Sequence, residues 1–122
     1  MVVNIPVGAI DAKIVSALSL SFPAGTSIFL GDTNTTHMRS RHPVDYAKYG
    51  ADIPYIIAHP DFVGLNPSDG SIEYVKEYIV NKEFVKVAVR VSGSGILFVR
   101  SLYVLNSRRV KNFISAGTLK AI

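Results

Sequence analysis

The sequence predicts an α+β fold in which N-terminal helices pack on a three- to four-stranded antiparallel sheet and a basic helix comes last. Three observations predict it. The first half has apolar residues at helical spacing and helix-breaking prolines. The second half has three strand-like runs joined by short turns, which is typical of an antiparallel meander. A segment rich in Arg and Lys follows these runs. A fold in which the helices pack on one face of the sheet accounts for this order of elements.

The composition indicates one domain spanning residues 1–122. A chain of 122 residues with 48% hydrophobic residues can bury a core. It has no cysteine, which excludes disulfides and Cys-based zinc sites. The apolar N-terminal stretch lacks a basic region and is interrupted by Asp11 and Lys13, so we expect no signal peptide. No apolar run reaches the roughly 18 residues of a membrane span. We therefore expect action in the cytoplasm, away from membranes.

The first elements are a helix and a short strand. Apolar residues recur at helical spacing from Ile10 to Leu18, which predicts an amphipathic helix over residues 9–20. Pro23 and Gly25 end this segment. Residues 27–30 form a short apolar strand candidate, and Gly31 follows it.

Residues 36–50, THMRSRHPVDYAKYG, hold two of the three histidines together with arginines and tyrosines. One of the residues 34–36 can cap a helix that carries His37, Arg39 and Arg41. Pro43 disfavours helical geometry at His42 and suits a first helical position. We therefore predict a break at His42 and a second helix that Gly50 stops.

The remaining elements alternate between turns and extended runs. A third short helix covers residues 53–58, and residues 62–64 are extended. Strands are predicted over residues 71–80, 84–91 and 96–105, with turns at 66–70, 81–82 and 92–95. Asn106 or Ser107 can cap a basic helix that ends near Gly117.

The middle strand shows the clearest alternation. Val85, Val87, Val89 and Val91 point to one face, which must be core, and Lys86 and Arg90 point to the other. One face of an antiparallel sheet is often solvated, so we call the Lys86/Arg90 side the open face. In the last strand, alternation alone leaves open whether Arg100 or Ser101 lies on this face, because a bulge would change the answer.

Charge divides the chain into an acidic and a basic part. Residues 1–75 carry four Lys/Arg and seven Asp/Glu, a balance of −3. Residues 76–122 carry nine Lys/Arg and two Glu, a balance of +7. A part this basic favours a polyanionic partner, either nucleic acid or an acidic protein.

The residue types match RNA cleavage without a metal. That reaction needs a base for the 2′-OH, an acid for the leaving 5′-oxygen, and donors for the charge on the phosphoryl oxygens. Histidine, Lys or Arg, and Ser or Tyr supply these roles. Nucleotide-cofactor, H-E-x-x-H and G-x-S-x-G motifs do not occur, so we expect no cofactor and no metal. His59, beside Pro60, is expected to be a structural or capping residue.

Several segments, in this order, resemble the phage-associated branch of the BECR superfamily of small α+β ribonuclease domains (barnase, EndoU, colicin ribonucleases, RelE). The resemblance runs from about Ile28 to Ile122. The segments that carry it are HMRSRHP (37–43), IPYIIAHPDFVG (53–64), IEYVK (72–76), KVAVRV (86–91), FVRSLYVLN (98–106), SRRVKNF (107–113) and GTLKA (117–121).

The resemblance implies a toxin-like, metal-independent endoribonuclease acting on RNA, with tRNA as one candidate substrate. Superfamily members draw catalytic groups from a helical His or basic residue and from polar residues on the sheet. Carried onto this sequence, the catalytic set is His37, His42, Lys76, Arg100, Ser101 and Tyr103. The RNA-binding set expected from the basic residues is Arg39, Arg41, Lys86, Arg90, Arg108 and Arg109.

Within the catalytic set, we expect His37 or His42 to transfer the proton and Lys76 and Arg100 to stabilise the phosphate, with Ser101 or Tyr103 as hydrogen-bond donor. A toxin also implies an acidic antitoxin or immunity protein as partner. The alternative is a non-catalytic phage or mobile-element module that binds RNA or protein on a degenerate BECR fold.

Overall fold

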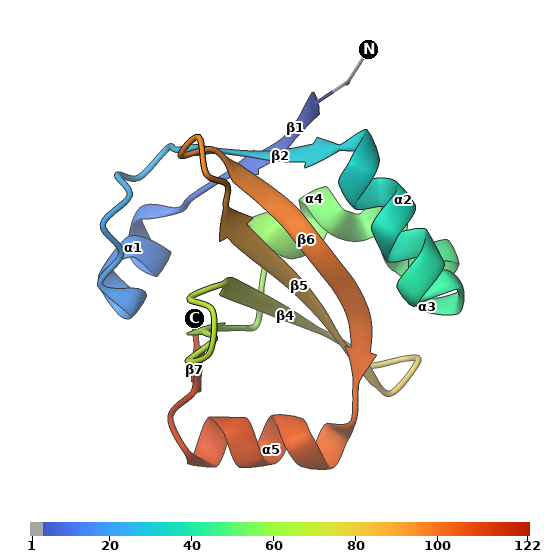
Figure 1. Cartoon of the computed structure of the whole chain (residues 1–122). Coiled ribbons are helices and arrows are strands. Elements are labelled where there is room, and N and C mark those ends of the chain that lie inside the picture. Colours follow the sequence, from blue (N-terminus) through green and yellow to red (C-terminus); the bar gives the residue numbers. More distant parts are fainter. Residues whose placement is uncertain (1–3) are drawn as a thin grey trace.

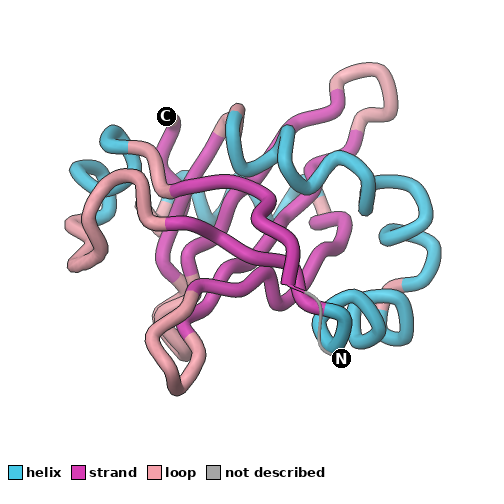
Figure 2. Tube along the Cα trace, turned by 90° about the horizontal axis from the view of Figure 1, so that it is seen from above, coloured by secondary structure: helices cyan, strands magenta, loops and turns pink. Residues whose placement is uncertain are grey.

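A computed structural model describes residues 4–122 and shows one curved sheet with helices around it (Figure 1). The seven strands are β1 (Asn4–Ala9), β2 (Ser27–Gly31), β3 (Phe62–Leu65), β4 (Ile72–Tyr78), β5 (Glu83–Val91), β6 (Leu97–Leu105) and β7 (Leu119–Ala121). The helices are α1 (Ala12–Leu18), α2 (Asp32–Arg41), α3 (Pro43–Tyr49), α4 (Ile53–Ala58) and α5 (Ser107–Ser115), with a 3₁₀ helix at Gly50–Asp52. Seen from above, the strands run through the middle, with helical segments around them (Figure 2).

The α+β class is confirmed, but the predicted sheet of three to four antiparallel strands is too small. The strand order is β1-β2-β6-β5-β4-β3-β7. The β4–β5–β6 meander is antiparallel as predicted, whereas β2 pairs in parallel with the start of β6. The parallel pairing joins Ile28 to Leu97, two residues far apart in the chain, and local sequence patterns do not report such a pairing.

The N-terminal segment also differs from prediction. Residues 4–9 form an edge strand, and α1 begins only at Ala12. The Asp11 carboxylate accepts a hydrogen bond from the Lys13 amide at 2.7 Å and so caps the helix. Ile10 is buried, but it lies before the helix. The apolar spacing therefore identified the core residues correctly and placed the helix start too early.

The predicted break in residues 36–50 is confirmed. His42 has φ −137° and ψ 65°, and α3 begins at Pro43. The first helix of this pair starts earlier than expected, at Asp32, and the Asn34 side chain accepts from the Gly31 amide at 3.3 Å. At Gly50, α3 ends and the chain continues as a 3₁₀ turn, where a Cβ would lie 2.9 Å from the Tyr46 ring.

The first face of the sheet carries the main core. Val85, Val87 and Val89 of β5 are buried there, under α1 to α4, as predicted. Val91 was also predicted to be core, but it is 43% exposed, because it is the last residue of β5 and lies next to the turn at 92–95. The helices contribute Ile14, Leu18, Met38, Tyr49, Ile53, Ile56 and Ile57 to this core. The sheet therefore separates a fully apolar side from the open face.

The last helix does not join the others, which corrects the placement of all helices on one face. Val75 and Leu105 alternate with Tyr74 and Val104, which belong to the main core, so they point to the open face. They form a second apolar cluster with Val110 of α5. Helix α5 therefore covers one end of the open face and leaves the other end uncovered, and Figure 1 shows it apart from α2 and α3.

The outer edge of β6 is covered by helices rather than by a strand. Within β6, only Leu97 and Phe98 pair with β2, and both α2 and α3 contact β6. The Asp45 carboxylate of α3 accepts a hydrogen bond from the Val104 amide at 3.0 Å. This arrangement brings α2, with its histidine, to the border of the open face.

A bulge in β6 decides the question that alternation left open. Ala88 pairs with Ser101, and Val89 pairs with Val99, so Arg100 is the extra residue. Arg100 and Ser101 both line the same cavity on the open face. Neither side chain therefore points to the core side of the sheet.

Within residues 4–122, no helix has both the length and the apolar character needed to cross a membrane.

Candidate functional site

A cavity of about 250 Å³ lies on the uncovered end of the open face, and we call it the site cavity. Residues from one helix, three strands and one loop converge on it. They are His37, Asn66, Asp69, Ser71, Glu73, Lys86, Ala88, Arg90, Arg100, Ser101 and Tyr103.

Four of the six catalytic residues expected from the sequence line this cavity. His37 comes from α2, whereas Arg100, Ser101 and Tyr103 come from β6. Ser101 and Tyr103 lie two residues apart on one face of the strand, and the bulge adds Arg100 beside them. His37 reaches them because α2 lies against the β6 edge. One proton-carrying ring, one guanidinium and two hydroxyls therefore share one cavity.

His42 lies next to the site cavity rather than on its lining. Its ring stacks on Tyr103, with centroids 5.0 Å apart and planes 25° apart. The Lys86 ammonium lies 4.6 Å from the centroid of the same ring. The break before Pro43 thus places the two histidines at one tyrosine, His42 against its ring and His37 in the cavity that it lines.

The floor of the cavity holds a buried ion pair that was not in the predicted catalytic set. Lys86 Nζ lies 2.8 Å from Glu73 Oε2, and their side chains are only 11% and 9% exposed. The Asn66 amide also donates to Glu73 Oε2, at 3.5 Å. Both hydrogen bonds use Oε2, so Oε1 has no hydrogen-bond partner among the described residues.

Lys86 remains a cation in this buried position. Burial by itself would lower the pKa of Lys86, but the Glu73 carboxylate and the Tyr103 hydroxyl outweigh it and raise the pKa above its ordinary value. The cavity floor therefore carries a fixed positive charge beside a carboxylate.

A tight turn forms the rim of the cavity opposite α2. The Asp69 carboxylate accepts the Ser71 amide at 2.9 Å and lies 3.8 Å from the Arg90 guanidinium. Hydrogen bonds from Ser71 lower the pKa of Asp69, and the charge of Arg90 acts in the same direction. The Gly70 amide donates to the Asn66 carbonyl at 2.8 Å, which confirms the turn predicted at residues 66–70.

Lys76 does not join the other expected catalytic residues. It pairs with Val85, and so it points to the helix-covered face of the sheet. Its ammonium lies 3.5 Å from Asp61 and 5.2 Å from the centroid of the Tyr55 ring. It lines a different cavity, together with His59.

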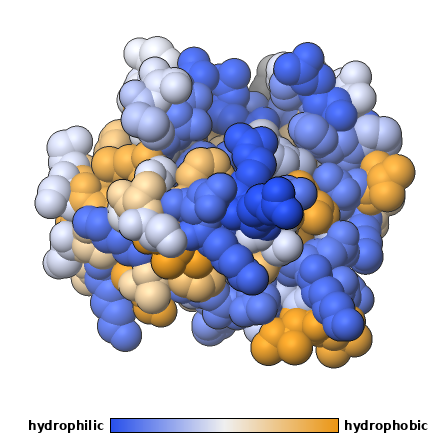
Figure 3. All heavy atoms as spheres, turned by 90° about the horizontal axis from the view of Figure 1, so that it is seen from below, coloured by the Kyte–Doolittle hydropathy of each residue, from blue (hydrophilic) through white to orange (hydrophobic). Residues whose placement is uncertain are grey.

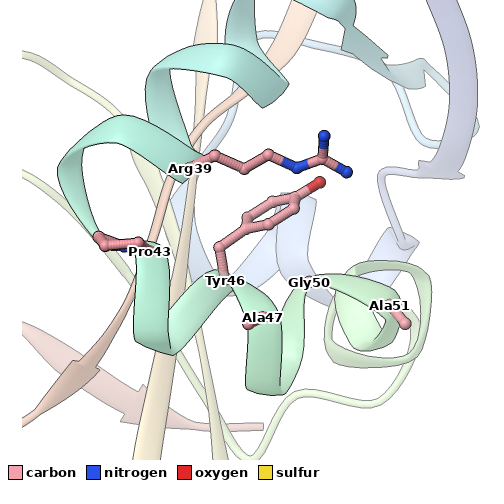
Figure 4. Close-up of a pocket in the computed structure, with 6 residues that line it drawn as sticks. All are labelled: Arg39, Pro43, Tyr46, Ala47, Gly50 and Ala51. Carbon is pink, nitrogen blue, oxygen red and sulfur yellow. The ribbon is translucent and has the colours of Figure 1, made fainter.

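The six expected RNA-binding residues fall into three places. Lys86 and Arg90 line the site cavity. Arg39 lies over the Tyr46 ring at 5.4 Å, in a hollow of about 640 Å³ between α2 and α3 (Figure 4), and Arg41 is exposed at the end of α2.

The other two, Arg108 and Arg109, are exposed in the first turn of α5. Figure 3 views the molecule from the side of α5, and hydrophilic residues gather over the middle of that surface.

Glu73 is the functional candidate that sequence reasoning missed, and the strand itself held the signal. The two-residue alternation that groups Tyr74 with Lys76 places Glu73 on the opposite face, the face of Lys86. Glu73 pairs with Ala88, two residues along β5 from Lys86, which is the diagonal position that long side chains reach.

No group of three or more His, Asp or Glu side chains within residues 4–122 is placed to hold a metal ion.

Comparison with known families gives one match. The model of a family described as phage-Barnase-EndoU-ColicinE5/D-RelE like nuclease3 matches residues 5–112, which includes every lining residue of the site cavity. No curated protein matches the chain. No solved structure matches it either.

Proposed function

The chain belongs to this family of phage Barnase-EndoU-ColicinE5/D-RelE like nucleases, and from that premise we propose that it is a metal-independent endoribonuclease. The observation that carries the proposal is the meeting of His37, Arg100 and the Glu73–Lys86 pair in one cavity. Two groups there can exchange protons, and two cations can hold a phosphate. This set matches the needs of 2′-OH attack on the adjacent phosphorus.

In the proposed reaction, the scissile phosphate lies against Arg100 and near Lys86. Arginine binds two phosphate oxygens at once through its planar fork, and the Lys86 ammonium adds a fixed charge. The hydroxyls of Ser101 and Tyr103 donate to the phosphoryl oxygens as their charge increases. These donors are held by the sheet before substrate arrives, which favours the transition state over the free substrate.

His37 and Glu73 are the proposed proton carriers. One takes the proton of the 2′-OH as its oxygen bonds to phosphorus, and the other protonates the 5′-oxygen as its bond to phosphorus breaks. The products are a 2′,3′-cyclic phosphate and a 5′-hydroxyl. His42 acts through Tyr103, whose ring it contacts, and we propose it as a positioning residue.

The proposal is tested by incubating the purified protein in EDTA with total tRNA and with mixed RNA. We expect fragments that end in 2′,3′-cyclic phosphate and 5′-hydroxyl. RNA binding without cleavage at any protein concentration would instead support a non-catalytic module on the same fold.

The site assignment is tested by His37→Ala, which should lower the cleavage rate by about 10²–10⁴-fold. His59→Ala is the matched control, because His59 is an exposed histidine that lies outside the site cavity. Equal loss in both variants, or full activity in His37→Ala, would contradict the assignment.

We further propose that the protein acts as a toxin on cytoplasmic RNA and that an acidic protein neutralises it. The excess of +7 over residues 76–122 supports such a partner, since an acidic surface over the basic half would block RNA. Co-expression with the product of a neighbouring acidic reading frame should restore growth and recover a complex that dissociates as salt rises. Toxicity unchanged by every neighbouring product would count against a partner of this kind.

A further inference from the structure

A second cavity, of about 260 Å³, adjoins the site cavity and is not used by the proposed reaction. We call it the neighbouring cavity. Arg90 and Arg100 line both cavities, so two guanidinium groups stand between them. Arg100 is there because of the β6 bulge, and Arg90 lies across from Phe98 in the strand pairing. Any group held by both arginines is therefore positioned to extend into each cavity.

The neighbouring cavity is lined by an aromatic ring and by hydroxyl groups, which are the groups that can bind a nucleoside. The Phe98 ring lines it and is partly exposed, and a second ring, Phe29, supports it with centroids 6.4 Å apart. An aromatic face held in this way can stack on a base. Thr33 and Ser92 line the same cavity and bring hydroxyls that can hydrogen-bond a base edge or a ribose.

The sizes of the two cavities fit one nucleotide-sized group in each. Cavities that enclose drug-sized ligands measure about 300–1,000 Å³, and each of these is below that range. Two adjoining cavities with arginines between them match two nucleosides joined by one phosphate. A stacked pair of bases inside a duplex could not present an open face to Phe98.

We propose that the neighbouring cavity is a nucleoside subsite, in which Phe98 stacks on the base next to the cleaved phosphate. The inference rests on the proposed RNA cleavage and names its substrate as a single-stranded or looped segment of at least two nucleotides. Arg90 and Arg100 hold the linking phosphate. Binding energy from the second nucleoside then aligns the 2′-OH in the site cavity.

The test measures binding apart from cleavage. A 2′-O-methyl dinucleotide keeps both bases and the phosphate but has no 2′-OH that can attack. We expect it to bind at least about tenfold more tightly than either nucleoside monophosphate, which is the range of one base–aromatic stack. Phe98→Leu keeps an apolar side chain without a ring, and it should remove most of that difference. Phe113→Leu, which changes a half-buried ring on α5, is the matched control and should leave the difference intact.

Kinetics give the second readout. With a ribodinucleotide or a longer single strand, Phe98→Leu should raise KM about tenfold more than Phe113→Leu does, and duplex RNA should resist cleavage. Equal dinucleotide and mononucleotide affinity, or a Phe98→Leu variant that matches Phe113→Leu, would overturn the subsite. Ring-dependent dinucleotide binding with no cleavage of any RNA would keep the subsite and overturn the proposed reaction, so the two failures are distinguishable. Circular dichroism of both variants checks that they are folded.

Discussion

At the scale of single residues, the Glu73–Lys86 pair sets the character of the site. A buried ion pair gives little net stability, but it places an ammonium and a carboxylate side by side on the floor of the cavity. The lysine also contacts Tyr103, and through that ring it lies close to His42. A change at any one of these residues therefore alters the surroundings of the others.

Removing one member of this pair should destabilise the protein strongly. Glu73→Leu leaves the Lys86 ammonium buried without its carboxylate, and we expect unfolding to become easier by about 3–5 kcal/mol. The double variant Glu73→Leu/Lys86→Leu should recover most of that loss, because no unpaired charge remains. Urea titration of both variants measures the effect. A double variant as unstable as the single one would show that the loss comes from packing and not from charge.

The pair also predicts how stability changes with pH. The pKa of Lys86 is raised in the fold from its ordinary value of 10.5, with the Glu73 and Tyr103 contributions outweighing burial. Its stabilising contribution is then complete below 10.5 and is lost as pH rises through the folded value. The stability advantage of wild type over Lys86→Met should therefore shrink above pH 10.5. Denaturation curves of the two proteins, compared at each pH, test this, and a constant difference would contradict it.

Residue type and family resemblance together selected several residues that line this cavity, and they failed where the alternation of a strand was not applied to each of its residues. His37, Arg100, Ser101 and Tyr103 were identified from residue type and family resemblance, and the structure brings them together. Lys76 was included because the IEYVK segment resembles the family, although alternation with Tyr74 places it on the core side of the sheet. The same alternation would have placed Glu73 on the open face, the face of Lys86.

At the scale of elements, the helix pair α2–α3 replaces a strand at the edge of β6. An uncovered strand edge invites pairing with other chains, and here α3 closes it with the Asp45 carboxylate. The break at His42 was predictable because a proline constrains the residue before it. The position of the pair along β6 was not predictable, because it depends on a contact between residues 45 and 104.

The Asp45 contact should matter for both stability and the site. Asp45→Ala removes a hydrogen bond to a charged acceptor, which is typically worth about 1.5–3 kcal/mol. The Val104 amide should also exchange its hydrogen faster, since its partner is gone. Asp45→Asn keeps an acceptor oxygen and should cost less. Protection of Val104 that is unchanged in Asp45→Ala would contradict this account of the edge.

The opposite edge of the sheet depends on a glycine. Gly64 pairs with Leu119 of β7, and a Cβ at this position would overlap the carbonyl oxygen of Thr118. Gly64→Ala should therefore cost at least about 1–3 kcal/mol, the range for overpacking. Gly93→Ala is the control, because a Cβ there meets nothing within 4 Å. Thermal unfolding of both variants checks the prediction, and equal Tm values would contradict it.

At the scale of the whole molecule, the helices and the basic residues are distributed unevenly over the two faces of the sheet. Four helices close the first face of the sheet, while α5 closes only one end of the second and carries exposed arginines in its first turn. The basic character of the second half was evident from composition. The seven-stranded order was not, because β1 and β7 are edge strands whose partners are distant in the chain.

This layout predicts that α5 contributes to RNA affinity without affecting catalysis. Each Lys or Arg that neutralises a phosphate of a single strand changes the slope of log K against log salt by about 0.7. Arg108→Gln/Arg109→Gln should therefore reduce the slope by up to about 1.4, with no change in the rate at saturating RNA. Lys13→Gln/Lys82→Gln, which removes two exposed charges elsewhere, should leave the slope as in wild type. Equal slopes for the two double variants would count against this role of α5.

The parallel pairing of β2 with β6 has a consequence for the ribosome that makes this protein. The proposed site combines His37, which follows β2, with Arg100 of β6, and these two strands pair through residues 28–29 and 97–98. Contacts of such long sequence separation form late in folding. Since β6 supplies Arg100, Ser101 and Tyr103, a nascent chain whose β6 has not yet left the ribosome has no complete site cavity, and the proposed RNA cleavage cannot begin before that point.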